Sequence, residues 1–263
     1  MRWLVVAAVS GELAALREVF TATVPRTHLG WASFDRGEIA GQETGLLKCG
    51  VGKVNAAMAT VQAIASYRPE AILTIGSAGA LIPGLEPGDV ILGEQVVQHD
   101  VGYVRAGTFI PTGVVVYEVG ARGRQQTRFA ADADLLARAE WAAAAAGLAV
   151  RRGLVATGDI VVMSTTHKRR LVEQFEAAVV EMESGAIAQV AQAHRVPWLA
   201  IRAVSDTADE SVVPGVGSTI DATDGPPHAV PSEQAEAAAL LRAGIAAANR
   251  AAAAVALATI RGG

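Results

Sequence analysis

Short apolar runs alternate with stretches of helical periodicity along most of the chain. Apolar runs bounded by Gly or Pro predict buried strands, and longer stretches with apolar residues three and four apart predict helices. The predicted strands are 3–9, 44–49, 71–76, 89–97, 152–157, 177–181 and 198–205. The predicted helices are 11–20, 53–67, 132–147, 166–175, 183–194 and 232–260. This alternation is typical of an α/β fold with a largely parallel sheet.

The C-terminal helix expected at 232–260 is rich in alanine and has one apolar face. Apolar or small residues recur along it four and three apart, at 241, 245, 248, 252, 255 and 259. Such a face packs either on the body of the domain or against another subunit, and the sequence leaves both open. Segments 100–128 and 207–231 fit no element, and the second has a composition that favours a mobile lid. Without a visible linker or repeat, residues 1–263 are expected to form a single domain.

Composition and charge limit the classes of function. Hydrophobic residues make up 51% of the 263 residues and charged residues 18%, which opposes disorder. A net charge of −4 without a basic stripe opposes a nucleic-acid or anionic-membrane partner. One cysteine, Cys49, excludes an internal disulfide, and the five histidines lack metal-ligand spacing. We therefore expect no metal.

No uninterrupted apolar run reaches the ~18–20 residues that span a bilayer. The apolar start at 3–9 is followed closely by Glu12, which favours a buried first strand over a secretory leader. We therefore expect a cytoplasmic protein without membrane contact.

Acidic residues cluster after two predicted strands. Glu181 and Glu183 follow the run 177–180, and Arg202 and Asp206 come at the end of 198–205. An unpaired buried charge costs several kcal/mol, so acids at such positions are expected either to be paired or to serve a function. Ligands of open α/β sheets bind at the carboxyl ends of strands. These residues therefore favour an enzyme active site.

Glu12 has two interpretations. In the first turn of a helix after strand 3–9, an acid complements the helix dipole by ~0.3–1 kcal/mol. The same position also places a carboxylate over a strand end, where it can activate water. The residues alone leave both open.

Two glycine-rich segments are also ambiguous. Gly76-Ser77-Ala78-Gly79 follows a predicted strand and is either a tight turn into a helix or a backbone surface for a ligand. It is not a nucleophile elbow, because Ile75 stands where that motif needs glycine. The run 49–53 fits neither a phosphate loop nor a dinucleotide fingerprint, which favours a simple turn before helix 53–67.

Four segments together resemble the purine nucleoside phosphorylase superfamily. They are Gly76–Gly79, Gly153–Asp159, Val180–Ser184 and Arg202–Asp206, in matching order and spacing. Over about residues 1–210 the chain is most similar to the 5′-methylthioadenosine/S-adenosylhomocysteine nucleosidases. The resemblance implies a three-layer αβα fold with a twisted, partly closed mixed sheet, and a homodimer. It also implies hydrolysis of the N-glycosidic bond of an adenine nucleoside with a 5′-thio group, without metal or cofactor.

The resemblance assigns a role to each acid. Asp206 is expected to protonate the leaving adenine at N7, with Ser205 orienting it, which requires a raised pKa or a shared proton. Glu183 is expected to hold the ribose hydroxyls and stabilise the oxocarbenium-like state. Glu12 is expected to activate the attacking water, helped by Arg202 and the Ser77 turn.

A further set of residues is expected to contact the substrate. These are Val9, Val51, Ser77, Ala78, Gly79, Val161, Val162, Glu181 and Met182. Two of them depart from the branch: Val161 replaces an aromatic that stacks on adenine, and Val9 replaces a common methionine. We expect weaker base stacking and an altered 5′ pocket.

Hydrolysis is favoured over phosphorolysis. Phosphorylases of the superfamily hold phosphate with arginines, whereas Ser10-Gly11-Glu12 and the run 71–75 carry no basic residue. Three alternatives stay open: a futalosine-type nucleoside hydrolase, a nucleoside phosphorylase, and a non-catalytic nucleoside-binding protein.

Overall fold

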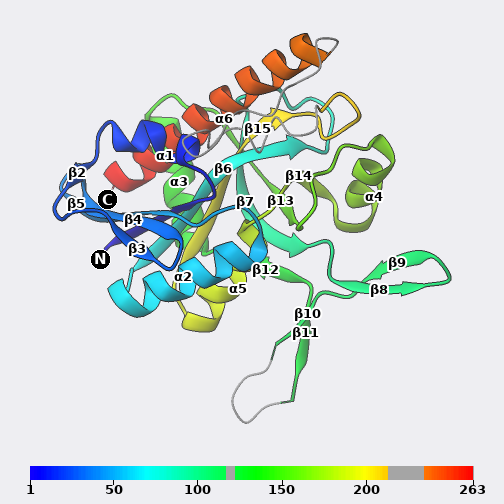
Figure 1. Cartoon of the computed structure of the whole chain (residues 1–263), viewed down its shortest axis with the longest axis horizontal. Coiled ribbons are helices and arrows are strands. Elements are labelled where there is room, and N and C mark those ends of the chain that lie inside the picture. Colours follow the sequence, from blue (N-terminus) through cyan, green and yellow to red (C-terminus); the bar gives the residue numbers. More distant parts are fainter. Residues whose placement is uncertain (117–121, 213–233, 263) are drawn as a thin grey trace.

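The computed structural model describes residues 1–116, 122–212 and 234–262. Among them, eleven strands form one mixed sheet (Figure 1). Its strands are β1 (Trp3–Ala7), β2 (Thr21–Ala22), β3 (Thr27–Leu29), β4 (Ala32–Ile39), β5 (Gln42–Lys48), β6 (Ala71–Ala80), β7 (Val90–Gln98), β12 (Arg128–Ala130), β13 (Val150–Thr157), β14 (Ala177–Glu181) and β15 (Trp198–Asp206). The strands β8 (Gly102–Arg105) and β9 (Thr108–Pro111) pair as a hairpin, and β10 (Val114–Val116) pairs with β11 (Arg124–Gln126).

Part of the sheet closes on itself. Strand β7 pairs with β13, β13 with β14, β14 with β6, β6 with β15, and β15 again with β7. Beyond β6 the sheet continues openly through β1, β5 and β4. Parallel and antiparallel pairs both occur, so the prediction of a mixed, partly closed sheet is confirmed.

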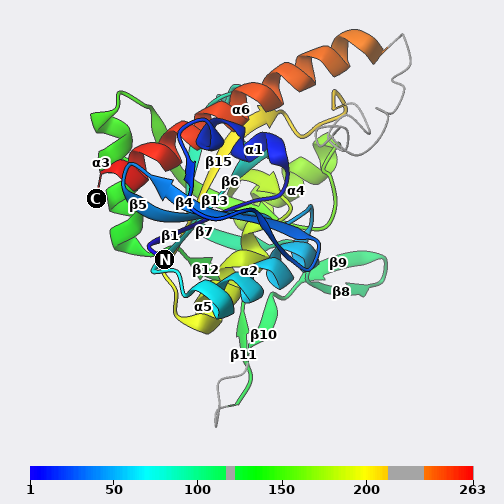
Figure 2. The same cartoon turned by 60° about the vertical axis from the view of Figure 1, so that its left-hand side comes forward.

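Helices cover both faces of the sheet. The helices α2 (Lys53–Tyr67) and α5 (Ser184–His194) lie side by side on one face, and α1 (Ser10–Arg17), α3 (Ala133–Ala145) and α6 (Ala235–Arg261) lie on the other (Figures 1 and 2). Each face buries its own apolar cluster. The helix α4 (Thr165–Phe175) packs beside β13 and β14. The three-layer αβα prediction is therefore confirmed.

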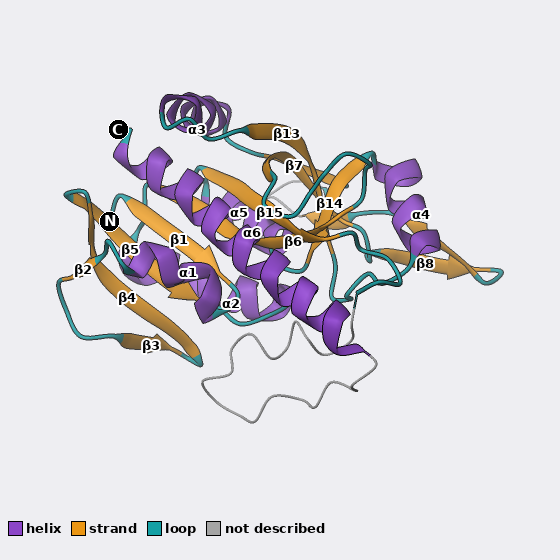
Figure 3. Cartoon of the chain, turned by 90° about the horizontal axis from the view of Figure 1, so that it is seen from above, coloured by secondary structure: helices purple, strands orange, loops and turns teal. Residues whose placement is uncertain are grey.

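Helix α6 crosses the molecule along one face of the sheet (Figure 3). All six positions of its predicted apolar face, 241, 245, 248, 252, 255 and 259, are buried. The helix is long and apolar enough to cross a membrane by length and composition, yet 56% of that window is buried within the protein, as in a core helix. Residues 232–233 of the predicted helix and 213–231 of the predicted lid lie outside the described residues.

The structure differs from the sequence prediction in three places. Strand β4 was missed, although its turn into β5 at Ala40-Gly41 has positive φ at both residues, as a two-residue hairpin requires. Segment 100–128, for which the sequence pattern predicts no element, contains short hairpins, which project from the body in Figure 1. Strand β6 does not end at Gly76 but runs on to Ala80, so 76–79 is not a turn into a helix.

Candidate active site

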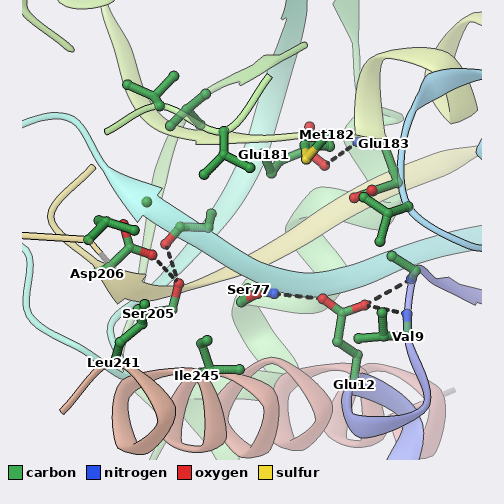
Figure 4. Close-up of a pocket in the computed structure, with 18 of the residues that line it drawn as sticks. Val9, Glu12, Ser77, Glu181, Met182, Glu183, Ser205, Asp206, Leu241 and Ile245 are labelled. Carbon is green, nitrogen blue, oxygen red and sulfur yellow. Dashed lines mark hydrogen bonds between the residues drawn. The ribbon is translucent and has the colours of Figure 1, made fainter. Parts of the chain in front are cut away.

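A cavity of about 520 Å³ opens where β1, β6, β14 and β15 end. Every residue predicted for the site lines it, except Arg202. Figure 4 shows Asp206 and Ser205 at one end and Glu12 and Glu183 at the other. The sequence therefore identified both ends of one cavity.

Glu12 is held by backbone amides at the start of α1. The amides of Ala8 and Val9 donate to its Oε2 at 2.8 and 3.3 Å, and the amide of Ser77 donates to its Oε1 at 3.1 Å. Because Glu12 is buried, its pKa is raised above the ordinary value, against the opposing effects of Arg202 and these amides. A fixed carboxylate with a raised pKa is suited to accept a proton.

The continuation of β6 brings Ser77 to Glu12. Gly76 pairs with Arg202 of β15, and a side chain at position 76 would collide with the Glu12 carboxylate and the Arg202 guanidinium. Glycine is therefore required here because two charged groups approach the backbone. Residues 76–79 are thus part of a strand that passes beneath the site, and the backbone amide of Ser77 points at the Glu12 carboxylate.

Arg202 lies inside β15 rather than at its end, and it is 1% exposed. Its Nη2 is 2.6 Å from Glu181 Oε2 and donates to Thr74 Oγ1 at 3.0 Å. Its Nη1 is 3.7 Å from Glu183 Oε2 and has no hydrogen-bond partner among the described residues. Arg202 does not line the cavity, so it acts by holding carboxylates and not by touching a ligand.

Glu181 is surrounded by protein donors. Besides Arg202, its carboxylate accepts from the Thr157 hydroxyl and from the amides of Glu183 and Ser184 at 2.9 and 2.8 Å. It borders the cavity, but its oxygens are engaged by the protein. The structure thus places Glu181 as a support for the turn that carries Glu183.

Glu183 occupies the N-cap position of α5 without a side-chain hydrogen bond to that helix, and its Oε1 accepts from the amide of Gly52 at 2.9 Å. Burial raises its pKa to about 8, with further contributions from the nearby Glu181 and Glu12 and an opposing one from Arg202. One guanidinium thus faces three buried carboxyl groups, and Glu183 keeps its proton until about pH 8. Once ionised, the Glu183 carboxylate is placed to stabilise a cation.

A β-bulge shapes the other end. Val204 pairs with Ala78 and Asp206 with Gly79, so Ser205 is the extra residue. Consecutive strand residues normally face opposite sides, yet both Ser205 and Asp206 line the cavity. The Ser205 hydroxyl lies 2.7 Å from Asp206 Oδ2 and 3.3 Å from the carbonyl of Ala78.

Apolar side chains form the remaining wall. Val161, with 62% of its surface exposed, and the buried Val162 come from the 158–163 loop between β13 and α4. Six lining residues were not predicted: Ala8, Met163, Val180, Val212, Leu241 and Ile245. The apolar face of α6 was the available signal for Leu241 and Ile245, because it continues past the core onto the cavity (Figure 4).

The described lining residues include no Lys, Arg or His. A phosphate dianion needs several cationic or N–H donors, and the Ser77 amide already donates to Glu12. The cavity therefore suits an uncharged ligand with a developing positive charge, and it opposes phosphate binding.

Comparison with known proteins agrees with this geometry. A model of the phosphorylase superfamily matches residues 2–255. The 5′-methylthioadenosine/S-adenosylhomocysteine nucleosidases of Shewanella piezotolerans and Geobacillus kaustophilus are 36% and 37% identical over 80% of this chain, covering 88% and 86% of those proteins.

A solved structure of the nucleosidase of the same name from Neisseria meningitidis, in complex with methylthio-immucillin-A, superposes with a TM-score of 0.78. It is 31% identical and covers 99% of this chain and 98% of that chain. The chain belongs to the phosphorylase superfamily and, within it, to the family of 5′-methylthioadenosine/S-adenosylhomocysteine nucleosidases.

Proposed function

We propose that this protein hydrolyses the N-glycosidic bond of 5′-methylthioadenosine, S-adenosylhomocysteine or a closely similar adenine nucleoside. The observation that carries the proposal is the placement of Glu12, Glu183 and Asp206 around one cavity whose described lining has no cationic side chain. Membership of the nucleosidase family supports it.

At the sugar end, Glu183 binds the ribose hydroxyls, and the ionised form of its carboxyl group, which predominates above about pH 8, stabilises the oxocarbenium-like state. A raised pKa makes Glu12 the stronger proton acceptor, so it takes a proton from the water that attacks the anomeric carbon. Arg202 is a positioning residue, because it holds Glu181 and Glu183 from beneath the cavity.

At the base end, Asp206 donates a proton to N7 of adenine. The bond between the anomeric carbon and N9 breaks, and its electron pair stays with the base. The Ser205 hydroxyl orients the Asp206 carboxyl, and Val161 and Val162 contact the purine. Free adenine and the 5-thio-ribose leave with the oxygen of water on the sugar.

The apolar wall supports an uncharged thioether at the 5′ position. Cavities for small molecules are typically about 300–1,000 Å³ and mostly apolar, and this one, at about 520 Å³, fits that description. Val9, Val51, Val212, Leu241 and Ile245 supply the apolar surface.

The test is release of free purine from 5′-methylthioadenosine, S-adenosylhomocysteine and aminodeoxyfutalosine, each with and without phosphate. The proposal expects adenine from the two thio-nucleosides at a rate independent of phosphate. Release only with phosphate would identify a phosphorylase, and binding of all three without release would identify a non-catalytic binding protein. Preference for aminodeoxyfutalosine would assign a futalosine-type hydrolase.

We further propose a homodimer that uses the groove between α2 and α5. This groove is lined by Val54, Ala57, Val61 and Val190 among others, and Val54 and Val61 are 68% and 40% exposed. Light scattering of the purified protein is expected to give twice the mass of 27.0 kDa. Val54→Glu is expected to shift the protein toward the monomer, whereas a monomeric parent protein would contradict the proposal.

We also propose that the protein acts in the cytoplasm, in methionine salvage. The apolar segment Trp3–Ala7 is strand β1, which pairs with β5 on one side and β6 on the other, and this place inside the sheet supports the proposal. Fractionation of the source cells is expected to find the activity in the cytosol, and loss of the gene is expected to raise 5′-methylthioadenosine in the cell.

A further inference from the structure

The 158–163 loop has neither helix nor strand, yet three of its residues, Val161, Val162 and Met163, line the cavity. The loop is anchored at its first two residues. The amide of Gly158 donates to the carbonyl of Glu181 at 3.0 Å, and the amide of Asp159 donates to Asp100 Oδ2 at 2.8 Å. A side chain at 158 would collide with the buried His99 ring, so the loop start is confined on that side as well.

Asp100 and Asp159 are joined through Lys53. The Nζ of Lys53 is 2.6 Å from Asp100 Oδ1, and the backbone amide of Lys53 donates to Asp159 Oδ1 at 2.7 Å. The side chains of Lys53 and Asp100 are 16% and 22% exposed, so this ion pair is partly shielded from water. Three residues from distant parts of the chain thus form one closed network.

The network adjoins the sugar end of the cavity. Gly52, directly before Lys53, donates its amide to Glu183 Oε1 at 2.9 Å. Gly52 is the N-cap of α2 and has no side chain to cap the helix, so carboxylates from elsewhere bind two consecutive amides. The Gly52 amide holds Glu183, which binds the sugar. The Lys53 amide holds Asp159, which anchors the loop that contacts the base.

We propose that Lys53, Asp100 and Asp159 form a positioning network that sets the 158–163 loop at a fixed distance from Glu183. This inference rests on the proposed function, because it assigns base contact to the loop and sugar contact to Glu183. None of the three residues touches the substrate. Their effect is transmitted by Val161 and Val162, which are only two and three residues from Asp159.

Asp159→Ala removes the acceptor for the Lys53 amide and frees the loop. Small displacements of binding groups cost about 10- to 100-fold in enzymatic rate. We expect free adenine to bind at least about tenfold more weakly, and the methylthioadenosine KM to rise by a similar factor, with a smaller change in kcat. Asp159→Asn keeps an oxygen that accepts from the Lys53 amide, so it is expected to retain most of the affinity.

The matched control is Glu140→Ala, which removes a carboxylate from an exposed ion pair with Arg152 on α3 and β13. It is expected to leave adenine affinity and KM unchanged. Because Lys53 and Asp159 also line the α2–α5 groove, all variants are compared at equal oligomeric state, measured by light scattering.

Calorimetric titration with adenine and steady-state kinetics with methylthioadenosine as substrate test the proposal. An Asp159→Ala protein whose adenine affinity and KM match those of the Glu140→Ala control would overturn the network. So would an Asp159→Asn protein as impaired as Asp159→Ala, because the acceptor would then not matter. The proposed function is judged separately, by adenine release from the parent protein, whereas the network is judged by the ratio of adenine affinities.

Discussion

The two ends of the cavity are built in different ways. At the sugar end, Glu12, Glu183 and Arg202 are buried, belong to or adjoin regular elements, and share their hydrogen bonds with strands and helix ends. At the base end, the half-exposed Asp206 and the exposed Val161 lie on a strand terminus and a loop. Charge stabilisation is thus placed on a fixed, buried framework, whereas base recognition is placed on more exposed residues.

The largest expected effect comes from changing Glu12, the residue that activates water at the sugar end. Glu12→Gln keeps one of the two oxygens that accept from backbone amides and removes the proton acceptor, so kcat is expected to fall about 10²- to 10⁴-fold with little change in KM. In the parent protein, kcat/KM is expected to fall as the pH falls through the raised pKa of Glu12, at a pH above the ordinary glutamate value. A full-rate variant in steady-state assays would remove the role of Glu12 as base.

Asp206→Asn is expected to cost a similar factor with adenine nucleosides, about 10²- to 10⁴-fold. The roles of the two acids can be distinguished with a substrate whose leaving group needs no proton. With a p-nitrophenyl riboside, the Asp206→Asn protein is expected to recover near-parental rates, because nitrophenolate leaves unaided, whereas Glu12→Gln stays slow. An equal loss of rate in both variants with this substrate would contradict the division of the site into a sugar end, where water is activated, and a base end.

Arg202→Leu leaves Glu181 and Glu183 buried without their cation. Breaking a buried ion pair on one side costs about 3–5 kcal/mol, so the free energy of unfolding is expected to fall by that amount. The control is Arg152→Leu at the exposed pair with Glu140, which is expected to lower the free energy of unfolding far less, because water screens an exposed ion pair. Urea denaturation of both variants measures the difference, and equal costs would contradict the buried framework.

Glu183→Gln is expected to stabilise the protein more as the pH rises. In the unfolded chain Glu183 ionises near pH 4.5, but in the folded protein it keeps its proton until about pH 8, so folding binds a proton between these values. The parent protein therefore loses stability across this window, at about 1.4 kcal/mol for each unit of pKa difference, and the glutamine variant does not.

The measurement is Tm at pH 5 and pH 8, with Glu140→Gln as the exposed control. The gap between Glu183→Gln and the parent is expected to widen at pH 8, by about 2–4 °C for each kcal/mol. A gap that is constant with pH would show that burial does not raise the pKa of Glu183.

Val161→Phe is expected to have the smallest effect. An aromatic ring at this position adds a stacking surface for the purine, worth about 1 kcal/mol, so adenine is expected to bind about fivefold more tightly. Ile160→Phe is the control, because Ile160 is half-exposed and does not line the cavity. Calorimetry that finds equal adenine affinity in both variants would place Val161 away from the base.

The acids of the site were predictable because they follow apolar strands, where a charge needs a partner or a purpose. The position of Arg202 was not, since a single arginine in an apolar run does not reveal that Gly76 on the next strand leaves room for it. The α6 periodicity predicted burial correctly but did not separate core from cavity, because both present an apolar neighbour to Leu241 and Ile245. The bulge at Ser205 depends on pairing with β6 and has no local signal.

The central claim is that water, and not phosphate, takes the sugar from adenine. Turnover of methylthioadenosine in ¹⁸O-labelled water with phosphate present, followed by mass spectrometry of the sugar product, tests it most directly. The proposed mechanism predicts one ¹⁸O atom in the 5-methylthioribose and no sugar phosphate. An unlabelled 5-methylthioribose 1-phosphate product would contradict it.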